Sequence, residues 1–190
     1  MSGDMITWEE RQALTEELLA TAKAFDAAAE AAFAEKNGVY ALIYCGKELG
    51  GSPWDEPEAH IVYVGHIGED SIRHWLDDTG ISTVRRSLSA MLHSACELVP
   101  VPKSDDPDDE DRFANYKLDP ESESRLTAWM KENLRLSFLE LEGEQLEASY
   151  LGLLDYNAPM FNFQHNPNNS FGHQIKAYRL QMSELAASRA

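Results

Sequence analysis

The hydrophobic period changes near residue 38, and this change constrains the fold more than any other feature. From residue 7 to 36 apolar residues recur at helical spacing without Gly or Pro, and Thr7 with Glu10 forms a capping box, which predicts one long helix. Two short runs rich in β-branched and aromatic residues follow, 39–44 and 60–64. Because one loop joins them, we expect an antiparallel hairpin.

The rest of the chain alternates between helical and strand patterns. A segment from Ser71 is expected to be helical up to a break at 77–80, Ser82 or Thr83 is expected to cap the next helix, and residues 100–111 read as a charged loop. Further helices are expected at 83–92, 120–133, 144–154 and from 174 on, with a strand at 134–138. The sequence therefore predicts an α/β (α+β) fold, in which helices flank a small, mostly antiparallel sheet and an N-terminal helix precedes it.

The same patterns divide the chain into three parts. Residues 1–37 form an N-terminal helical extension, 38–163 the main domain, and 164–190 a polar tail with a C-terminal helix. No internal repeat is visible. We leave open whether the N-terminal helix makes a homodimer.

Composition excludes several classes of protein. The chain has 16 Lys and Arg against 33 Asp and Glu, so its net charge of −17 argues against a protein that coats nucleic acid nonspecifically. No apolar stretch is long enough to span a membrane, and no secretory signal is expected. Cys45 and Cys96 stand far apart, which excludes a disulfide framework and favours a reducing cytoplasm.

Glycine–aromatic elements stand at the ends of the two predicted strands. Gly38-Val39-Tyr40 opens the first strand and Tyr63-Val64-Gly65 closes the second; Arg73, Glu147 and Asn162 follow in that order. This ordered set resembles the GIY-YIG nuclease family, with Val in place of Ile in each namesake element. Three further stretches resemble a subgroup of bacterial members, at residues 79–88, 115–121 and 125–130.

The resemblance implies metal-dependent hydrolysis of DNA phosphodiester bonds. Glu147 would hold Mg²⁺ or Mn²⁺, which acts as a Lewis acid toward the charge on the leaving oxygen. Arg73 would stabilise the charged transition state through fixed donors. Tyr40 would relay or accept the proton of the attacking water, with Tyr63 orienting water or phosphate beside it. Asn162 would brace the site through its amide.

Other cations are candidates for contact with the DNA backbone. Arg85 and Arg86 lie in the first turns of a predicted helix, and His74 follows Arg73. Arg85 and Arg86 have a second interpretation, in which they are counter-charges for the nearby acidic loop.

Two other functions remain open. The first is a nonenzymatic nucleic-acid or protein interaction module, whose site is weakened because Asp77 stands where many family members have a histidine. The second is an acidic protein that mimics DNA or inhibits a partner. It predicts that Arg73, Arg85 and Arg86 are buried in ion pairs.

Overall fold

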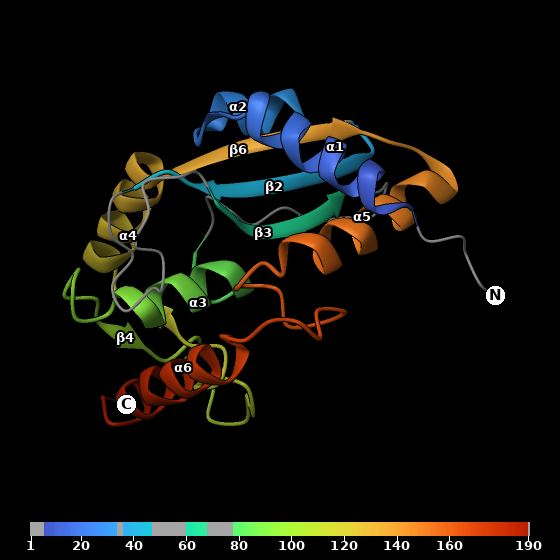
Figure 1. Ribbon diagram of the computed structural model, residues 1–190. Coiled ribbons are helices and arrows are strands. Elements are labelled where there is room, and N and C mark those ends of the chain that lie inside the picture. Colours follow the sequence, from blue (N-terminus) through green and yellow to red (C-terminus); the bar gives the residue numbers. More distant parts are fainter. Residues whose placement is uncertain (1–5, 34–35, 47–59, 68–77, 190) are drawn as a thin grey trace. The chain divides into compact units, whose positions relative to one another are not determined.

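The computed structural model describes residues 6–33, 36–46, 60–67 and 78–189 (Figure 1). The chain divides into two compact units, each built from separate segments. Unit 1 comprises residues 1–46, 57–72 and 131–172, and unit 2 comprises 47–56, 73–130 and 173–190. None of the helices in the described ranges has the length and apolar content needed to cross a membrane.

Unit 1 is built on a four-stranded antiparallel sheet with the order β1-β6-β2-β3. Its strands are β1 (Lys23–Ala24), β6 (Leu134–Glu140), β2 (Gly38–Tyr44) and β3 (His60–Ile67). The predicted hairpin is confirmed, since Tyr40 lies opposite Gly65 and Leu42 opposite Tyr63. The predicted α/β fold with a small antiparallel sheet and flanking helices is confirmed as well.

The prediction of one helix from 7 to 36 is wrong, although its capping box is present. The segment forms α1 (Trp8–Ala20), then β1, then α2 (Ala27–Ala32). The helix ends because residues 23–24 pair with β6, while the Thr21 hydroxyl bonds to the Glu17 carbonyl oxygen and to Ser137. A new helix then begins at Asp26, whose carboxylate accepts a hydrogen bond from the Ala29 N–H at 2.8 Å.

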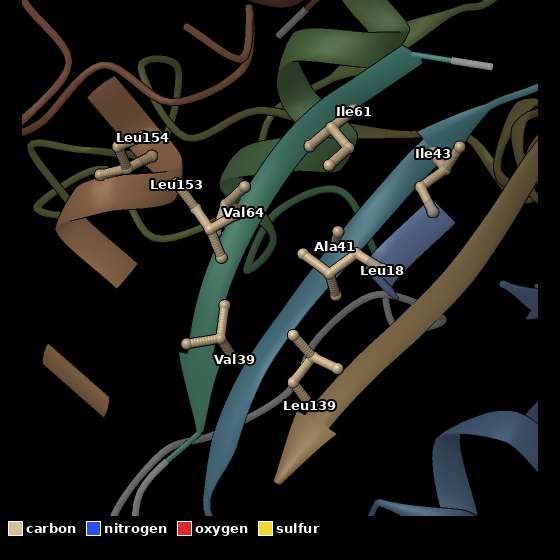
Figure 2. Close-up of a cluster of buried hydrophobic side chains, with 9 residues drawn as sticks. All are labelled: Leu18, Val39, Ala41, Ile43, Ile61, Val64, Leu139, Leu153 and Leu154. Atoms are coloured by element: carbon tan, nitrogen blue, oxygen red, sulfur yellow. The ribbon is translucent and has the colours of Figure 1, made fainter. Parts of the chain in front are cut away.

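Helices α1 and α5 (Gly143–Asn157) cover one face of this sheet. Figure 2 shows the apolar cluster, to which β2 contributes alternate residues because successive side chains of a strand point to opposite faces. Strand β3 contributes Ile61 and Val64, which lie on either side of a register shift in its pairing with β2. The members of the cluster are Leu18, Val39, Ala41, Ile43, Ile61, Val64, Leu139, Leu153 and Leu154. The even-numbered residues of β2, Tyr40 among them, therefore face away from this cluster.

Unit 2 contains helices and a two-stranded ribbon. Its elements are α3 (Thr83–Leu92), most of α4 (Pro120–Asn133), most of α6 (Gly172–Ala187), β4 (Pro100–Val101) and β5 (Lys117–Leu118). The Ser82 cap of α3 is confirmed, and so is the Asp119 start of α4. The loop predicted at 100–111 instead begins with β4, because Pro100 and Val101 pair with β5. The helix predicted from Ser71 lies outside the described residues.

A buried polar network holds unit 2 together. The Glu123 carboxylate accepts hydrogen bonds from Arg85 at 2.7 Å, from the N–H and hydroxyl of Thr79 at 2.8 and 3.0 Å, and from the Leu118 N–H at 3.2 Å. Arg86 donates to the carbonyl oxygens of residues 79 and 80. The stretches 79–88, 115–121 and 125–130 therefore meet in one interior.

Removing Arg85 should destabilise the protein, because the Glu123 carboxylate would lose its charged partner. The Arg85 side chain is 1% exposed and that of Glu123 18%. We expect Arg85→Met to lower the free energy of unfolding by about 3 kcal/mol in urea titrations. The matched control is Lys36→Met, because the Lys36–Glu140 pair is 46% and 58% exposed and should contribute less than about 1 kcal/mol. Equal losses in the two variants would contradict this view of the network.

Tyr116 should make the stability of unit 2 depend on alkaline pH. It is fully buried and donates a hydrogen bond to the Arg86 carbonyl oxygen at 2.8 Å. Burial raises the pKa of Tyr116 to about 12, and a hydrogen bond with Ser89 opposes this shift only in part. An unfolded phenol ionises near pH 10, so the folded state holds the proton more tightly. The free energy of unfolding should therefore fall as pH rises from about 10 to about 12.

Urea titrations at about pH 9 and about pH 11 measure this loss. Tyr116→Phe is the control, because phenylalanine cannot ionise. The wild type should lose about 1.4 kcal/mol more than the variant between the two pH values. An equal loss in both proteins would mean that this phenol is not the group responsible.

Candidate active site

Two tyrosines of the hairpin lie close together on unit 1. The ring centroids of Tyr40 and Tyr63 are 5.9 Å apart, and the ring planes are inclined by 40°. Tyr40 on β2 lies directly opposite Gly65 on β3, and its ring covers that glycine. A Cβ atom at Gly65 would overlap the Tyr40 ring, so this close approach requires glycine.

Gly38, which begins β2, must be a glycine for a similar reason. A Cβ atom at Gly38 would collide with the carbonyl oxygen of Leu139 on β6 and with the Phe138 ring. Both glycines of the two sequence elements therefore allow a neighbouring group to approach the backbone closely. The spacing of each glycine from its tyrosine places the two phenols over the same part of the sheet.

Tyr63 is a neutral hydrogen-bonding group near pH 7. Burial raises the pKa of Tyr63, and its hydrogen bond with Tyr40 opposes the shift in part. A phenol with a raised pKa keeps its proton and can donate it in a hydrogen bond. Tyr40 itself is 8% exposed. This arrangement suits Tyr63 to hold a water molecule or an anionic oxygen.

Asn162 braces the outer edge of β3. Its side-chain oxygen accepts a hydrogen bond from the Val64 N–H at 2.9 Å, and its amide nitrogen donates to the Val64 carbonyl oxygen at 2.7 Å. The neighbouring Phe161 N–H donates to the Val62 carbonyl oxygen at 3.0 Å. Residues 161–162 thus pair with an edge strand whose backbone groups on this side would otherwise need other partners.

Two asparagines of the polar tail hold Asn162 in turn. The amides of Asn166 and Asn169 donate to the Asn162 carbonyl oxygen at 3.2 and 2.7 Å. Asn166 is buried and also donates to the Pro159 carbonyl oxygen at 2.9 Å. Sequence reasoning treated this tail as lying outside the main domain. The run of asparagines just after Asn162 was the available signal.

Helix α5 carries Glu147, whose side chain is exposed. Tyr150 follows three residues later, so the two lie on neighbouring positions of the same helix face. The Tyr150 ring meets the His66 ring of β3 edge to face, with centroids 4.9 Å apart. Burial raises the pKa of Tyr150, the Tyr63 phenol raises it further, and a hydrogen bond with Asn162 lowers it in part. The face of α5 that bears Glu147 therefore meets β3 at His66, which the register places on the same sheet face as Val39 of the apolar cluster.

Sequence reasoning missed Tyr150 and His66. The useful signal was the helical spacing between Glu147 and Tyr150. The position of His66 directly after the second glycine element was a second signal.

The predicted cations fall into two groups. Arg73 and His74 lie outside the described residues. Arg85 and Arg86 belong to unit 2, where they are 1% and 6% exposed. Burial lowers the pKa of Arg86, as does the nearby Arg179, while charges that include Asp111 of the acidic loop oppose the shift. Within unit 2 Arg85 forms an ion pair with Glu123, and the contact of Arg85 and Arg86 with the DNA backbone stays a prediction.

Glu147 is an exposed carboxylate on this face of α5, and the exposed Glu144 lies one turn before it. Within the described ranges, no group of three or more His, Cys, Asp or Glu side chains could enclose a metal ion. Exposed carboxylates of this kind suit Mg²⁺, which commonly keeps several waters and binds proteins through one or two carboxylates. The donor present at this site therefore fits a hydrated divalent cation.

Comparison with known protein families shows to which family the chain belongs. The profile of the GIY-YIG catalytic domain matches residues 31–181, which include the hairpin, β6, α5 and Asn162. The chain belongs to the GIY-YIG family. Neither a curated protein nor a solved structure matches it at a significant level. Membership indicates a nuclease-type function, with a nucleic acid as substrate.

The family match also bears on the extent of the GIY-YIG domain. It begins before residue 38 and ends beyond residue 163, within α6. The predicted division at 37/38 and 163/164 stays a prediction. Helix α1 nevertheless packs on the same core as the sheet, since Leu18 is fully buried in it.

The close approach of Tyr40 to Gly65 in this GIY-YIG domain can be tested directly. We expect Gly65→Ala to displace the Tyr40 ring and to lower the free energy of unfolding by about 1–3 kcal/mol, as overpacking usually does. Near-ultraviolet circular dichroism should report the change at the tyrosine.

The control is Gly172→Ala, where the nearest atom to an added Cβ is 3.6 Å away in ordinary contact. This variant should keep the wild-type stability and spectrum. Wild-type behaviour of Gly65→Ala would contradict the packing described here.

Proposed function

We propose that this GIY-YIG protein is a metal-dependent endonuclease that hydrolyses DNA phosphodiester bonds. One observation carries the proposal: Tyr40, Asn162 and Tyr150, which shares a face of α5 with Glu147, all contact the part of β3 from Tyr63 to His66. Isolated tyrosines or glutamates are common surface residues. Their convergence on one short strand segment is what favours a catalytic role.

The chemistry we propose divides between these residues. Tyr40 takes or relays the proton of the attacking water, and the neutral Tyr63 phenol donates a hydrogen bond to water or phosphate. Asn162 keeps the segment of β3 beside Tyr63 fixed. Mg²⁺ or Mn²⁺ at Glu147 would supply a Lewis acid for the negative charge that develops during cleavage.

Arg73 completes the proposed set. The sequence resemblance gives it the role of a fixed cation near the scissile phosphate, where a guanidinium stabilises a charged transition state through two parallel hydrogen bonds. Arg73 lies outside the described residues, in the gap between residues 67 and 78. His74, beside it, is proposed to contact the DNA backbone.

We propose the cytoplasm as the site of action, because Cys45 and Cys96 are both free thiols. A homodimer through the N-terminal helix has no support in the structure. The buried residues of α1, Leu18 among them, already pack within unit 1.

An acidic inhibitor or DNA mimic is the second candidate, because one observation favours it. That function predicted that Arg85 is buried in an ion pair, and Arg85 lies 2.7 Å from Glu123 with 1% of its side chain exposed. The same pair also explains how unit 2 is stabilised, so it does not decide between the two functions. Cleavage of DNA does decide between them.

The first experiment is cleavage of supercoiled plasmid and of a branched DNA with Mg²⁺ or Mn²⁺. Glu147→Ala should lower the cleavage rate by at least about 100-fold, the scale seen when one electrostatic contribution to a transition state is lost. Glu132→Ala, which changes an exposed glutamate of α4, is the matched control and should cut like the wild type.

Each outcome points to a different conclusion. Equal cutting by the wild type and Glu147→Ala would indicate a contaminant or a different site. DNA binding without cutting would favour the interaction module. Neither cutting nor binding, with inhibition of another DNA-binding protein, would favour the acidic inhibitor.

A further inference from the structure

Tyr150 joins three parts of unit 1 that the proposed reaction uses. Its ring meets the His66 ring of β3 at 4.9 Å between centroids and at an angle of 64°. The pKa of Tyr150 responds to a hydrogen bond with Asn162, which lowers it in part, and to the Tyr63 phenol, which raises it. Tyr150 also packs against the apolar cluster of the sheet. One side chain of α5 thus interacts with β3, with Asn162 and with the apolar cluster.

The contact is directional, unlike the others between α5 and the sheet. Leu146, Leu153 and Leu154 also pack toward the cluster, but apolar contacts of this kind tolerate sliding and rotation. An edge-to-face ring contact and a hydrogen bond both fix an orientation. The Asn162 amide that meets Tyr150 is itself held by two hydrogen bonds to Val64. Tyr150 therefore docks α5 against a rigid point of β3.

Glu147 lies one helical turn before this contact. Three residues of an α-helix advance about 4.5 Å along its axis, so the carboxylate starts close to the docking point. Leu153 lies about 9 Å along the axis from Glu147, so it constrains the direction of the Glu147 side chain less than Tyr150 does. A small rotation of α5 about its axis would change the direction of the exposed Glu147 carboxylate. The Tyr150 contacts are those best placed to prevent that rotation.

We propose that Tyr150 is a positioning residue, which holds α5 against His66 and Asn162 so that the Glu147 carboxylate faces the Tyr40–Tyr63 pair. This inference rests on the proposed nuclease function and deepens it. Tyr150 itself touches neither the phosphate nor the metal. It acts through the orientation of the helix that carries Glu147.

A purely structural role is the alternative, and the chain offers a matched control for it. Tyr156 also belongs to α5 and also makes an aromatic contact, with Trp8 at 4.6 Å between centroids. It lies nine residues after Glu147, at the opposite end of the helix. If Tyr150 only stabilises the fold, Tyr150→Leu and Tyr156→Leu should behave alike in every assay.

The experiment compares these two variants and Tyr150→Phe in the full chain. Tyr150→Leu should lower kcat for DNA cleavage by about 100-fold, the effect expected from a displacement of about 1 Å in a reacting group. KM for DNA should stay within about twofold, because no phosphate contact is lost. Tyr150→Phe keeps the ring contact and loses the hydroxyl, so it should restore kcat to within about fivefold of the wild type.

Tyr156→Leu should lose thermal stability to a similar extent while keeping kcat within about twofold of the wild type. A second readout needs neither metal nor DNA. In amide NMR spectra of the metal-free protein, Tyr150→Phe should shift the side-chain NH₂ signals of Asn162, and Tyr156→Phe should leave them in place.

The outcomes separate the positioning role from the nuclease function. Cleavage by the wild type with equal kcat in Tyr150→Leu and Tyr156→Leu would overturn the positioning role alone. Unmoved Asn162 signals in Tyr150→Phe would also overturn it, because the contact would then be absent. A wild type that fails to cut any DNA tested would overturn the nuclease function and the positioning role with it.

Discussion

The edge of β3 is the constraint on which the arrangement of unit 1 depends. An edge strand leaves backbone N–H and C=O groups that need partners, and an asparagine side chain offers one donor and one acceptor. Asn162 uses both on Val64, and the Phe161 N–H adds a third hydrogen bond, to Val62. Because β3 is fixed here, Tyr63 and Gly65 on either side of Val64 are fixed too. The position of Tyr40 follows, since its ring rests on Gly65.

Unit 2 depends on a different kind of interaction. Its interior holds arginine guanidinium groups, a carboxylate and a buried phenol, which bind each other, nearby backbone groups and the hydroxyls of threonine and serine side chains. Such a network is costly to assemble and more costly to leave incomplete. This explains why three stretches that are separate in the sequence, 79–88, 115–121 and 125–130, meet in one interior. These polar groups stabilise unit 2, which explains why Arg85 and Arg86 are buried.

Much of the fold could be predicted from local patterns. The capping box at Thr7, the hairpin from 38 to 67 and the Asp119-Pro120 start of α4 all rest on neighbouring residues, and the structure confirms them. The single helix over 7–36 failed because β1 forms only by pairing with β6, more than 100 residues later in the sequence. Local propensity cannot reveal a partner so distant.

The same limit applies to the candidate site. Tyr40, Tyr63, Glu147 and Asn162 could be chosen from their order in the sequence. The Tyr150–His66 contact could not, because it joins a helix to a strand that precedes it by about 80 residues. For Arg85 and Arg86 the sequence left two interpretations open, contact with the DNA backbone and counter-charges for the acidic loop, and arginines are mostly exposed. Only their partners in α4 and in the 79–80 turn show that they are interior.

The interleaving of the two units has a consequence for biosynthesis. Unit 1 takes its last segment from residues 131–172 and unit 2 from 173–190, so each unit has all its parts only after these late segments have been added. Strand β2 must wait for β6 while a ribosome adds almost a hundred residues between them. Until then the apolar β2 strand has only β3 as a partner in the sheet. The nascent chain therefore passes through a long interval in which chaperones have a hydrophobic strand to bind.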